Sequence, residues 1–341
     1  MTGYEIIKAN INFTNPERIG IRFDRIVGDG DVYRIFVLPA KESRDDSKIY
    51  SVKYKLRPVE GYIDEWGCKW STTDGSGSDM GQVVNIPIED MEDYADYKMP
   101  DPRAEGRFDG LVEALDEAEE KGLYVQLNSP QCIFERMHFL RGFEDALIDC
   151  IIDKENVAIM IKDLADFQIG IIEEAYRLGK GRIHCYDTTD DWGTQENLLI
   201  PPDIWRELFK PQYKRIFDKA HECGMDIRFH TDGKVNAILE DLIELGVDII
   251  NIHQPRLVGI DEVSKIAQGR VCFEAAIDIQ TTLPSGDKEA IETEVKELVS
   301  KWATPNGGLI GIEYGYLDAI GVDKESMIYA YECFKKHGKL N

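Results

Sequence analysis

Short apolar runs and segments with helical spacing alternate along the chain, most clearly between residues 225 and 255. The apolar run 225–229 ends at His230-Thr231-Asp232, and beyond Gly233 apolar residues recur every three to four positions, which predicts a strand, a loop and a helix. A second strand is expected at 247–252 and ends at His253. Two consecutive strands are therefore followed at once by imidazole or carboxylate side chains.

The same alternation extends over most of the chain. Further strands are expected at 123–127, 182–186, 270–276 and 309–312, and a helix at 201–223 contains Pro211, which should kink it. Alternating strands and helices favour a parallel sheet. We predict an α/β fold of the (β/α)8 TIM barrel type, with a doubly wound open sheet as the alternative. The sequence lacks the glycine-rich phosphate turn that many doubly wound folds carry.

The N-terminal region has a different pattern. Two stretches with a period of two residues, 32–38 and 49–56, are joined by a polar segment, which predicts a β-ribbon. We expect residues 1–60 to form an extension packed on a barrel of residues 61–341.

Composition and charge narrow the class of protein. A chain of 341 residues with 43% hydrophobic content can bury the core of one barrel. The net charge of −24 argues against a nucleic-acid partner. No apolar run approaches the roughly twenty residues that span a membrane, and the N-terminus lacks the pattern of an export signal. Seven cysteines without a Cys-x-x-Cys pair indicate a reduced, cytoplasmic protein.

Polar residues at the predicted strand ends would meet at one rim of a barrel, where such enzymes hold their ligands. They are Asn128, Asp187, His230, Asp232, His253, Gln254, Glu274, Asp278 and Glu313. Some have simpler explanations, because an aspartate after a strand often caps the next helix. His230 and Asp232, two residues apart, can direct two ligating groups the same way, and a carboxylate leaving a buried strand, such as Glu313, needs a partner.

The chemistry of this rim has two interpretations. Histidine, aspartate and glutamate together suit Zn²⁺, or a harder divalent ion if oxygen ligands dominate. Acid–base chemistry without a metal is the alternative, with His230 titrating near neutrality. The loop 189–195 has many hydrogen-bonding groups around Trp192, which is typical of a substrate lid.

Four segments together resemble the uroporphyrinogen decarboxylase superfamily in order and spacing. They are DDWGTQENLLIPPDIWRELFKPQYKRIFDKAHECG at 190–224, FHTDGKVNAILEDLIELGVDIINIHQP at 229–255, FEAAIDIQTTLPSGD at 273–287 and PNGGLIGIE at 305–313. The resemblance implies a (β/α)8 barrel with its pocket at the C-terminal rim. True decarboxylases of this superfamily carry an arginine-rich motif ending in Gln-Ala-Gly-Arg and a histidine near the last strand, and this sequence has neither.

The other branch of the superfamily comprises corrinoid-dependent methyltransferases, which hold zinc with a His-x-Cys pair and a later cysteine. His230 matches their histidine, Asp232 stands in place of the first cysteine, and Glu313 lies near the expected third ligand. The sequence is most similar to members that demethylate aryl methyl ethers or related donors. The resemblance thus implies methyl transfer from a small methylated donor to a separate corrinoid protein, with zinc polarising the leaving oxygen.

In this interpretation the metal ligands are His230, Asp232 and Glu313, with Glu274 in reserve. Asp187 or Asp191 supplies a proton to the leaving group, and His230 also takes part in catalysis. The expected substrate contacts are Asn128, Trp192, Gln195, His253, Gln254 and Tyr314.

Two other functions fit the same sequence. One is a decarboxylase that acts on a tetrapyrrole or a smaller carboxylic acid without a metal. The other is a barrel that binds a methylated or corrinoid ligand without turning it over. A homodimer, if the chain forms one, would be symmetric.

Overall fold

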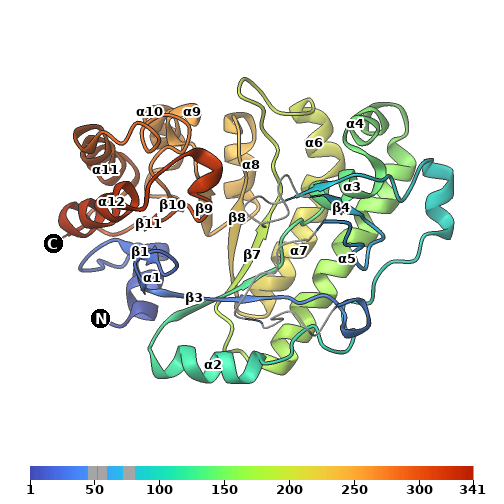
Figure 1. Ribbon diagram of the computed structural model, residues 1–341, viewed down its shortest axis with the longest axis horizontal. Coiled ribbons are helices and arrows are strands. Elements are labelled where there is room, and N and C mark those ends of the chain that lie inside the picture. The colour runs from blue at the N-terminus through green and yellow to red at the C-terminus, as the bar shows by residue number, and fades with distance from the viewer. Residues whose placement is uncertain (45–51, 53–59, 72–80, 341) are drawn as a thin grey trace.

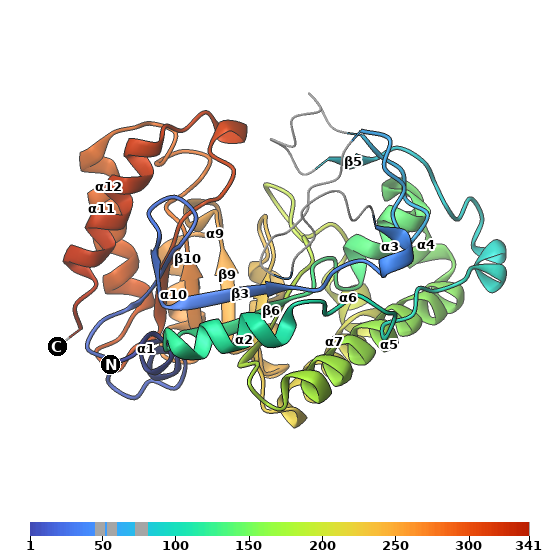
Figure 2. The same ribbon diagram turned by 60° about the horizontal axis from the view of Figure 1, so that its bottom comes forward.

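The computed structural model describes residues 1–341 except 45–51, 53–59, 72–80 and 341 (Figure 1). Its main sheet has nine strands in the order β2-β1-β11-β10-β9-β8-β7-β6-β3. Every pairing is parallel except that of β2 with β1. Helices surround the sheet, as the two views in Figures 1 and 2 show. The predicted α/β barrel is confirmed.

The barrel strands are short and mostly buried. In chain order they are β1 (Gly20–Phe23), β3 (Val32–Phe36), β6 (Tyr124–Asn128), β7 (Cys185–Thr189), β8 (Asp226–His230), β9 (Ile249–Ile252), β10 (Cys272–Ala275) and β11 (Leu309–Ile312). The strand β2 (Asp29–Gly30) lies at the edge, while β4 (Trp70–Ser71) and β5 (Gln82–Val83) form a small separate sheet.

The helices pack against the strands and against one another through their apolar residues. They are α1 (Gly3–Ile11), α2 (Leu111–Glu120), α3 (Phe134–Arg141), α4 (Phe143–Ile152), α5 (Lys154–Gly179), α6 (Pro202–Leu208), α7 (Lys210–Glu222), α8 (Leu239–Glu244), α9 (Pro255–Val258), α10 (Ile260–Ala267), α11 (Lys288–Trp302) and α12 (Lys324–His337). Short 3-10 helices lie at Lys41–Ser43, Met91–Asp96, Asn236–Ile238 and Asp318–Ile320. The helix expected at 201–223 is divided into α6 and α7 beside Pro211, because proline cannot donate the hydrogen bond that a continuous helix needs.

Part of the predicted N-terminal ribbon belongs to the barrel. Strand β3 pairs in parallel with β6, with Val32 opposite Tyr124, and β1 pairs in parallel with β11. Alternate residues of β3 face the barrel interior and the outer helices, which produces the same period of two as a ribbon. The barrel therefore includes strands within residues 1–60, and the second predicted stretch, 49–56, lies outside the described residues except Val52.

Asp31 joins the first and second barrel strands. Its backbone N–H donates to the Ile21 carbonyl at 2.8 Å, and its carboxylate accepts from the Ile21 N–H at 2.9 Å. Arg18 donates two further hydrogen bonds to the same carboxylate, both at 2.7 Å. One buried aspartate thus connects β1 to the segment that begins β3.

The interior of the barrel is built in layers. The lower layer is mostly apolar and consists of Val32, Tyr124, Cys185, Ile249, Cys272 and Ile310, against which Ile7 and Ile11 of α1 pack. Residues two positions further along a strand face the same way. The next level, here called the middle layer, therefore contains Arg22, Arg34, Gln126, Asp187, Arg228, Asn251, Glu274 and Ile312. The C-terminal strand ends lie above it.

The helices were also compared with what a membrane-spanning helix needs. Among the helices of the described residues, none combines the length and the apolar character that crossing a bilayer requires.

Candidate metal centre

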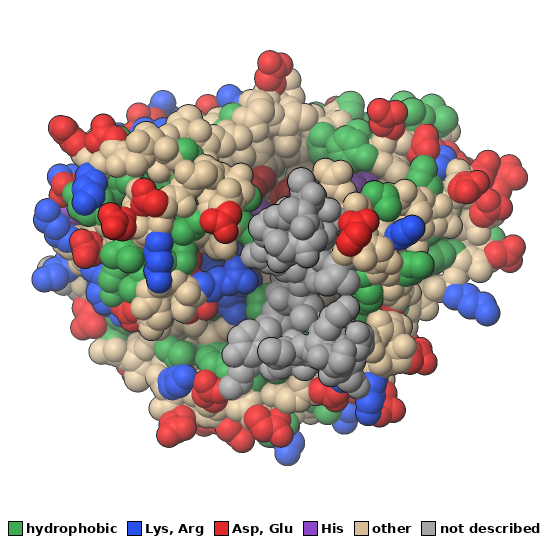
Figure 3. Space-filling view, viewed as in Figure 1, with side chains coloured by type: hydrophobic (Ala, Val, Ile, Leu, Met, Phe, Trp, Pro, Cys, Tyr) green, Lys and Arg blue, Asp and Glu red, His purple; other side chains and the backbone are tan. Residues whose placement is uncertain are grey.

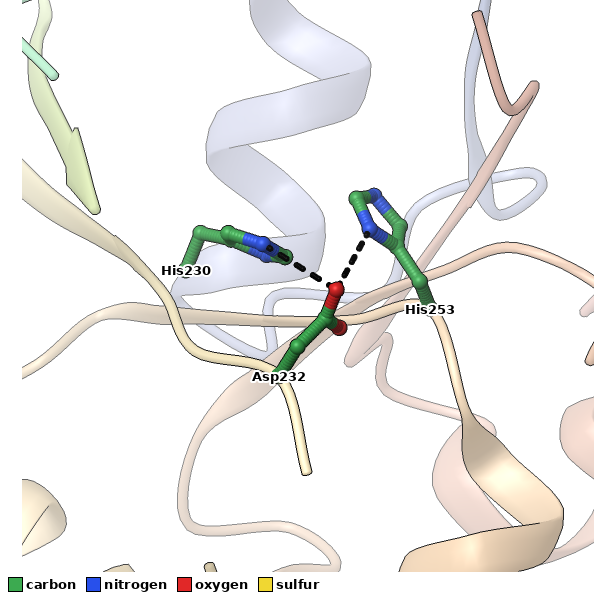
Figure 4. Close-up of side chains that lie close together, drawn as sticks. All are labelled: His230, Asp232 and His253. Atoms are coloured by element: carbon green, nitrogen blue, oxygen red, sulfur yellow. Dashed lines mark ion pairs between the residues drawn. The ribbon is translucent and has the colours of Figure 1, made fainter. Parts of the chain in front are cut away.

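Three side chains converge at the C-terminal ends of two adjacent strands. His230 is the last residue of β8, Asp232 follows it in the loop, and His253 comes directly after β9. Because β8 and β9 pair in parallel, with His230 opposite Asn251, these residues share the rim. The Asp232 Oδ2 lies 3.7 Å from His230 Nε2 and 3.7 Å from His253 Nδ1. Figure 4 shows the carboxylate between the two rings; we call His230, Asp232 and His253 the rim group.

Two glycines allow the loops after β7 and β8 to cross and hold Asp232 in place. The Gly193 N–H donates to the Asp232 carbonyl at 3.0 Å. A Cβ on Gly233, whose φ is +84°, would lie 2.1 Å from the Gly193 carbonyl oxygen, so a side chain cannot fit there. The Asp191 carboxylate accepts from the Asp232 N–H at 2.8 Å, and the Gln254 side-chain oxygen accepts from the Gly233 N–H at 2.9 Å.

The electrostatics of the rim group favour an ionised carboxylate beside a neutral imidazole. Burial raises the pKa of Asp232, but His230 and His253 outweigh it and lower this pKa to about 2. Burial and the nearby His230 lower the pKa of His253. Tyr314 packs edge-on against His253 at 5.3 Å between ring centroids, and burial raises the pKa of the Tyr314 hydroxyl to about 12.

The rim group fits a divalent metal ion. One ligand atom from each of the three residues lies within 4.8 Å of the other two. His230 Nδ1 and Asp232 Oδ1 are also buried without a hydrogen-bond partner in the described part of the chain. Leaving buried polar atoms unpaired costs stability, and imidazole nitrogen and carboxylate oxygen are ligands that zinc accepts.

The structure gives Glu313 and Glu274, which we expected as metal ligands, other partners. The Glu313 carboxylate accepts the backbone N–H groups of Arg25 at 2.6 Å and Ile26 at 2.9 Å, so it fixes the loop after β1. The Glu274 carboxylate is paired with Arg22 and Arg228 inside the barrel. Neither glutamate belongs to the rim group, whereas His253, expected as a substrate contact, does.

The two aspartates expected to supply a proton have different surroundings. Asp187 is fully buried, pairs with Arg228 at 2.5 Å and accepts from the Asn128 amide at 2.9 Å. Asn128 therefore orients Asp187 in the middle layer. Asp191 lies 3.6 Å from His230 Nε2, and burial, together with the negative charge of Asp232, raises the pKa of Asp191. The structure thus brings Asp191, and not Asp187, beside the rim group.

The loop after β7 is anchored by Trp192. Its side chain is fully buried, stacks on Phe134 at 4.2 Å between ring centroids and donates to the Tyr213 hydroxyl at 2.8 Å. Trp192 therefore positions the loop and is not placed to contact a substrate, while Gln195 is exposed further along.

Sequence reasoning missed Asp190, the neighbour of Asp191. Its buried carboxylate accepts the backbone N–H groups of Ile133 and Glu135, both at 2.8 Å, and the Tyr213 hydroxyl at 2.6 Å. Burial raises the pKa of Asp190 to about 6. Asp190 ties the start of α3 to the loop that carries Asp191, and its place in the Asp-Asp-Trp-Gly segment was the available signal.

Sequence reasoning also missed part of the middle layer. The sequence pattern places Arg34, Gln126 and Asn251 in strands, but nothing in the local sequence shows that their side chains meet charged groups from distant strands.

Comparisons with known proteins agree with the barrel and identify the family. A methyltransferase from Methanosarcina mazei has a TM-score of 0.60 and 14% sequence identity, covering 83% of this chain and 79% of that one. A D-psicose 3-epimerase from Clostridium cellulolyticum H10 has a TM-score of 0.41 and 10% identity, covering 72% of this chain and 86% of that one. Among curated proteins, none matches. The model of the uroporphyrinogen decarboxylase (URO-D) family matches residues 63–315, and the chain therefore belongs to that family.

Proposed function

We propose that the protein is a methyltransferase that moves a methyl group from a small methylated donor to a corrinoid protein, with zinc held by His230, Asp232 and His253. The observation that carries the proposal is the rim group, in which the Asp232 carboxylate lies between two imidazoles and His230 Nδ1 and Asp232 Oδ1 are buried without a partner in the described part of the chain. The Methanosarcina mazei neighbour is named a methyltransferase, and the proposal extends that activity to this chain.

The residues present suit this role. Asp232 is ionised at neutral pH because its pKa is about 2, and the lowered pKa of His253 keeps that imidazole unprotonated. Zinc bound at these residues would supply Lewis acidity to the oxygen that loses its methyl group. His230, Asp232 and His253 would hold the zinc, and three protein ligands is the number that catalytic zinc sites have.

The transfer requires one bond to break and one proton to be supplied. The bond between the methyl carbon and the donor oxygen breaks, the carbon joins the nucleophilic cobalt of the corrinoid, and the oxygen keeps the electron pair. Asp191 is placed to deliver a proton to that oxygen, because its carboxyl group lies 3.6 Å from His230 Nε2. Tyr314 and Gln254 border the same position.

The test is methyl transfer to reduced cobalamin, used in place of the corrinoid protein. Zinc-loaded protein is incubated with a panel of aryl methyl ethers, and the methyl–cobalt spectrum is recorded. We expect the signal to be lost in His253→Ala and retained in Glu313→Gln, which removes a carboxylate of the same rim that is outside the rim group. Turnover that persists in His253→Ala would contradict the proposal.

The basic residues of the middle layer favour a second candidate function, the decarboxylation of a small carboxylic acid without a metal. Arg22, Arg34 and Arg228 face the barrel interior, and Arg34, which forms no ion pair with a described residue, can hold an acid. This function predicts release of carbon dioxide that is unaffected by chelation. Residence in the cytoplasm and a symmetric homodimer stay predictions under either function.

A further inference from the structure

The middle layer contains more cationic than anionic groups. (β/α)8 barrels are usually filled at this level by bulky apolar side chains, so charged residues here require a reason. Three arginines, Arg22, Arg34 and Arg228, face two carboxylates, Asp187 and Glu274. Figure 3 shows Lys and Arg side chains gathered in the hollow at the centre of this face.

Two of the three arginines are paired. Glu274 accepts from Arg22 Nε at 2.9 Å and from Arg228 Nε at 2.5 Å. Arg228 also donates to Asp187 at 2.5 Å. Both carboxylates of the layer are therefore occupied by Arg22 and Arg228.

Arg34 is the arginine that remains. Within the part of the chain that the structure describes, its guanidinium makes no hydrogen bond or ion pair, and its Nε is buried. The guanidinium carbon of Arg34 lies 5.0 Å from the centroid of the Phe36 ring, and Asp187 attracts its charge without a hydrogen bond. Burial and the repulsion from Arg22 lower the pKa of Arg34 to about 10, which still leaves it charged at neutral pH. The Arg34 residue is half-buried, and a cation in that position with no hydrogen-bonded counter-ion among the described residues can take its anion from a ligand.

Unsatisfied amides lie in the same layer. Gln126 is opposite Arg34 in the pairing of β3 with β6, is fully buried, and has no partner for either its side-chain nitrogen or its oxygen among the described residues. A guanidinium beside an amide N–H is the set of donors that a carboxylate accepts.

We propose that Arg34 and Gln126 bind a carboxylate of the methyl donor, so that the substrate is a methylated carboxylic acid. The proposal rests on the proposed function for the position of the reacting group. Inward side chains two residues apart on a strand, such as Arg228 and His230, are about 7 Å apart. Arg34 lies on β3, which β6 and β7 separate from β8 in the sheet, so a donor that reaches both layers carries its carboxylate and its methylated oxygen at opposite ends, as in a benzoate with a methoxy group opposite the carboxylate.

The net charge of the protein means that an acidic ligand is attracted only by a local cation and not by the protein as a whole. A net charge of −24 repels anions at a distance. Binding of an acid then depends on the half-buried Arg34 of the middle layer, and one substitution should abolish it.

The test compares two ligands of similar size by calorimetry on the zinc-loaded protein. These probes are 4-methoxybenzoate and the neutral 4-methylanisole. We expect the wild type to prefer the acid by about tenfold or more, and Arg34→Met to lose that preference while its zinc content stays unchanged. Arg270→Gln removes an exposed arginine that is paired with Glu240 outside the barrel, and it should bind the acid as the wild type does.

A stability measurement separates a ligand-binding role from a structural one. Arg107 is also buried but is paired with Glu65 at 2.8 and 2.7 Å, so Arg107→Met should lower the melting temperature. Arg34→Met should leave the melting temperature unchanged or raise it. Arg34→Lys retains the charge without the planar fork and should weaken acid binding only in part.

The outcomes distinguish this proposal from the proposed function. An equal affinity of the wild type for both probes, or acid binding unchanged in Arg34→Met, would overturn the carboxylate site. Arg34-dependent acid binding without methyl transfer would leave the site in place and count against methyl transfer alone. Transfer from the neutral ether as efficient as from the acid would overturn only the substrate class.

Discussion

Replacing Glu274 with glutamine should destabilise the protein without removing metal. The Glu274 side chain is fully buried and is the shared partner of Arg22 and Arg228, so Glu274→Gln leaves three arginines facing the single carboxylate of Asp187. Burial raises the pKa of Glu274, but the two arginines outweigh it and lower this pKa from 4.5 to about 2. Breaking a buried ion pair of this kind costs about 3 kcal/mol of unfolding free energy.

The pH dependence follows from the same shift. Because the pKa of Glu274 is lower in the folded state than in the unfolded state, its contribution is fully present above pH 4.5 and is lost as the pH falls toward 2. We would therefore measure urea denaturation by circular dichroism at pH 7 and at pH 4 and below. The difference in unfolding free energy between the wild type and Glu274→Gln should become smaller as the pH falls. The exposed Glu240→Gln serves as the control and should change stability little.

Two results would refute this reasoning. A loss of stability below about 1 kcal/mol at pH 7 would show that the arginines do not depend on Glu274. A loss of bound zinc in Glu274→Gln, with stability unchanged, would return Glu274 to the metal ligands.

Three further predictions concern other parts of the structure. Gly233→Ala should lower both stability and zinc affinity, since its Cβ would meet the Gly193 carbonyl at 2.1 Å; thermal denaturation and metal titration check this. Burial lowers the pKa of His184 to about 4, and the His184 Nδ1 accepts the Val125 N–H at 2.9 Å. The free energy of unfolding should therefore fall as the pH drops from 6.5 toward 4, and His184→Asn should flatten that part of a pH–stability curve. Trp192→Phe should cost about 1 kcal/mol in urea denaturation through the lost hydrogen bond to Tyr213, with no change in donor affinity by calorimetry.

The sequence predicts the barrel well where the hydrophobic pattern is regular. The strands β8 and β9 and the polar residues at their ends lie where the pattern places them. The N-terminal strands were harder to recognise, because β1 has four buried residues without alternation and β3 alternates like a surface ribbon. Only the pairing with β11 and β6, which joins residues far apart in sequence, shows that both belong to the barrel.

The candidate site was predicted in part. His230 and Asp232 are two residues apart, so their proximity follows from one strand end, whereas the approach of His253 depends on the register of β8 against β9. Glu313 and Glu274 were expected as metal ligands because the sequence shows a carboxylate at a strand end and not its partner. Their partners, two backbone N–H groups in one case and two arginines in the other, come from distant segments.

Zinc content is the direct test of a metal site at His230, Asp232 and His253. Protein prepared with ample zinc is dialysed, and its metal is determined by elemental analysis for the wild type, His253→Ala and Glu313→Gln. If the rim group holds zinc, we expect about one zinc per chain in the wild type and in Glu313→Gln, and its loss in His253→Ala. No stoichiometric metal in the wild type, or loss in Glu313→Gln with retention in His253→Ala, would contradict it.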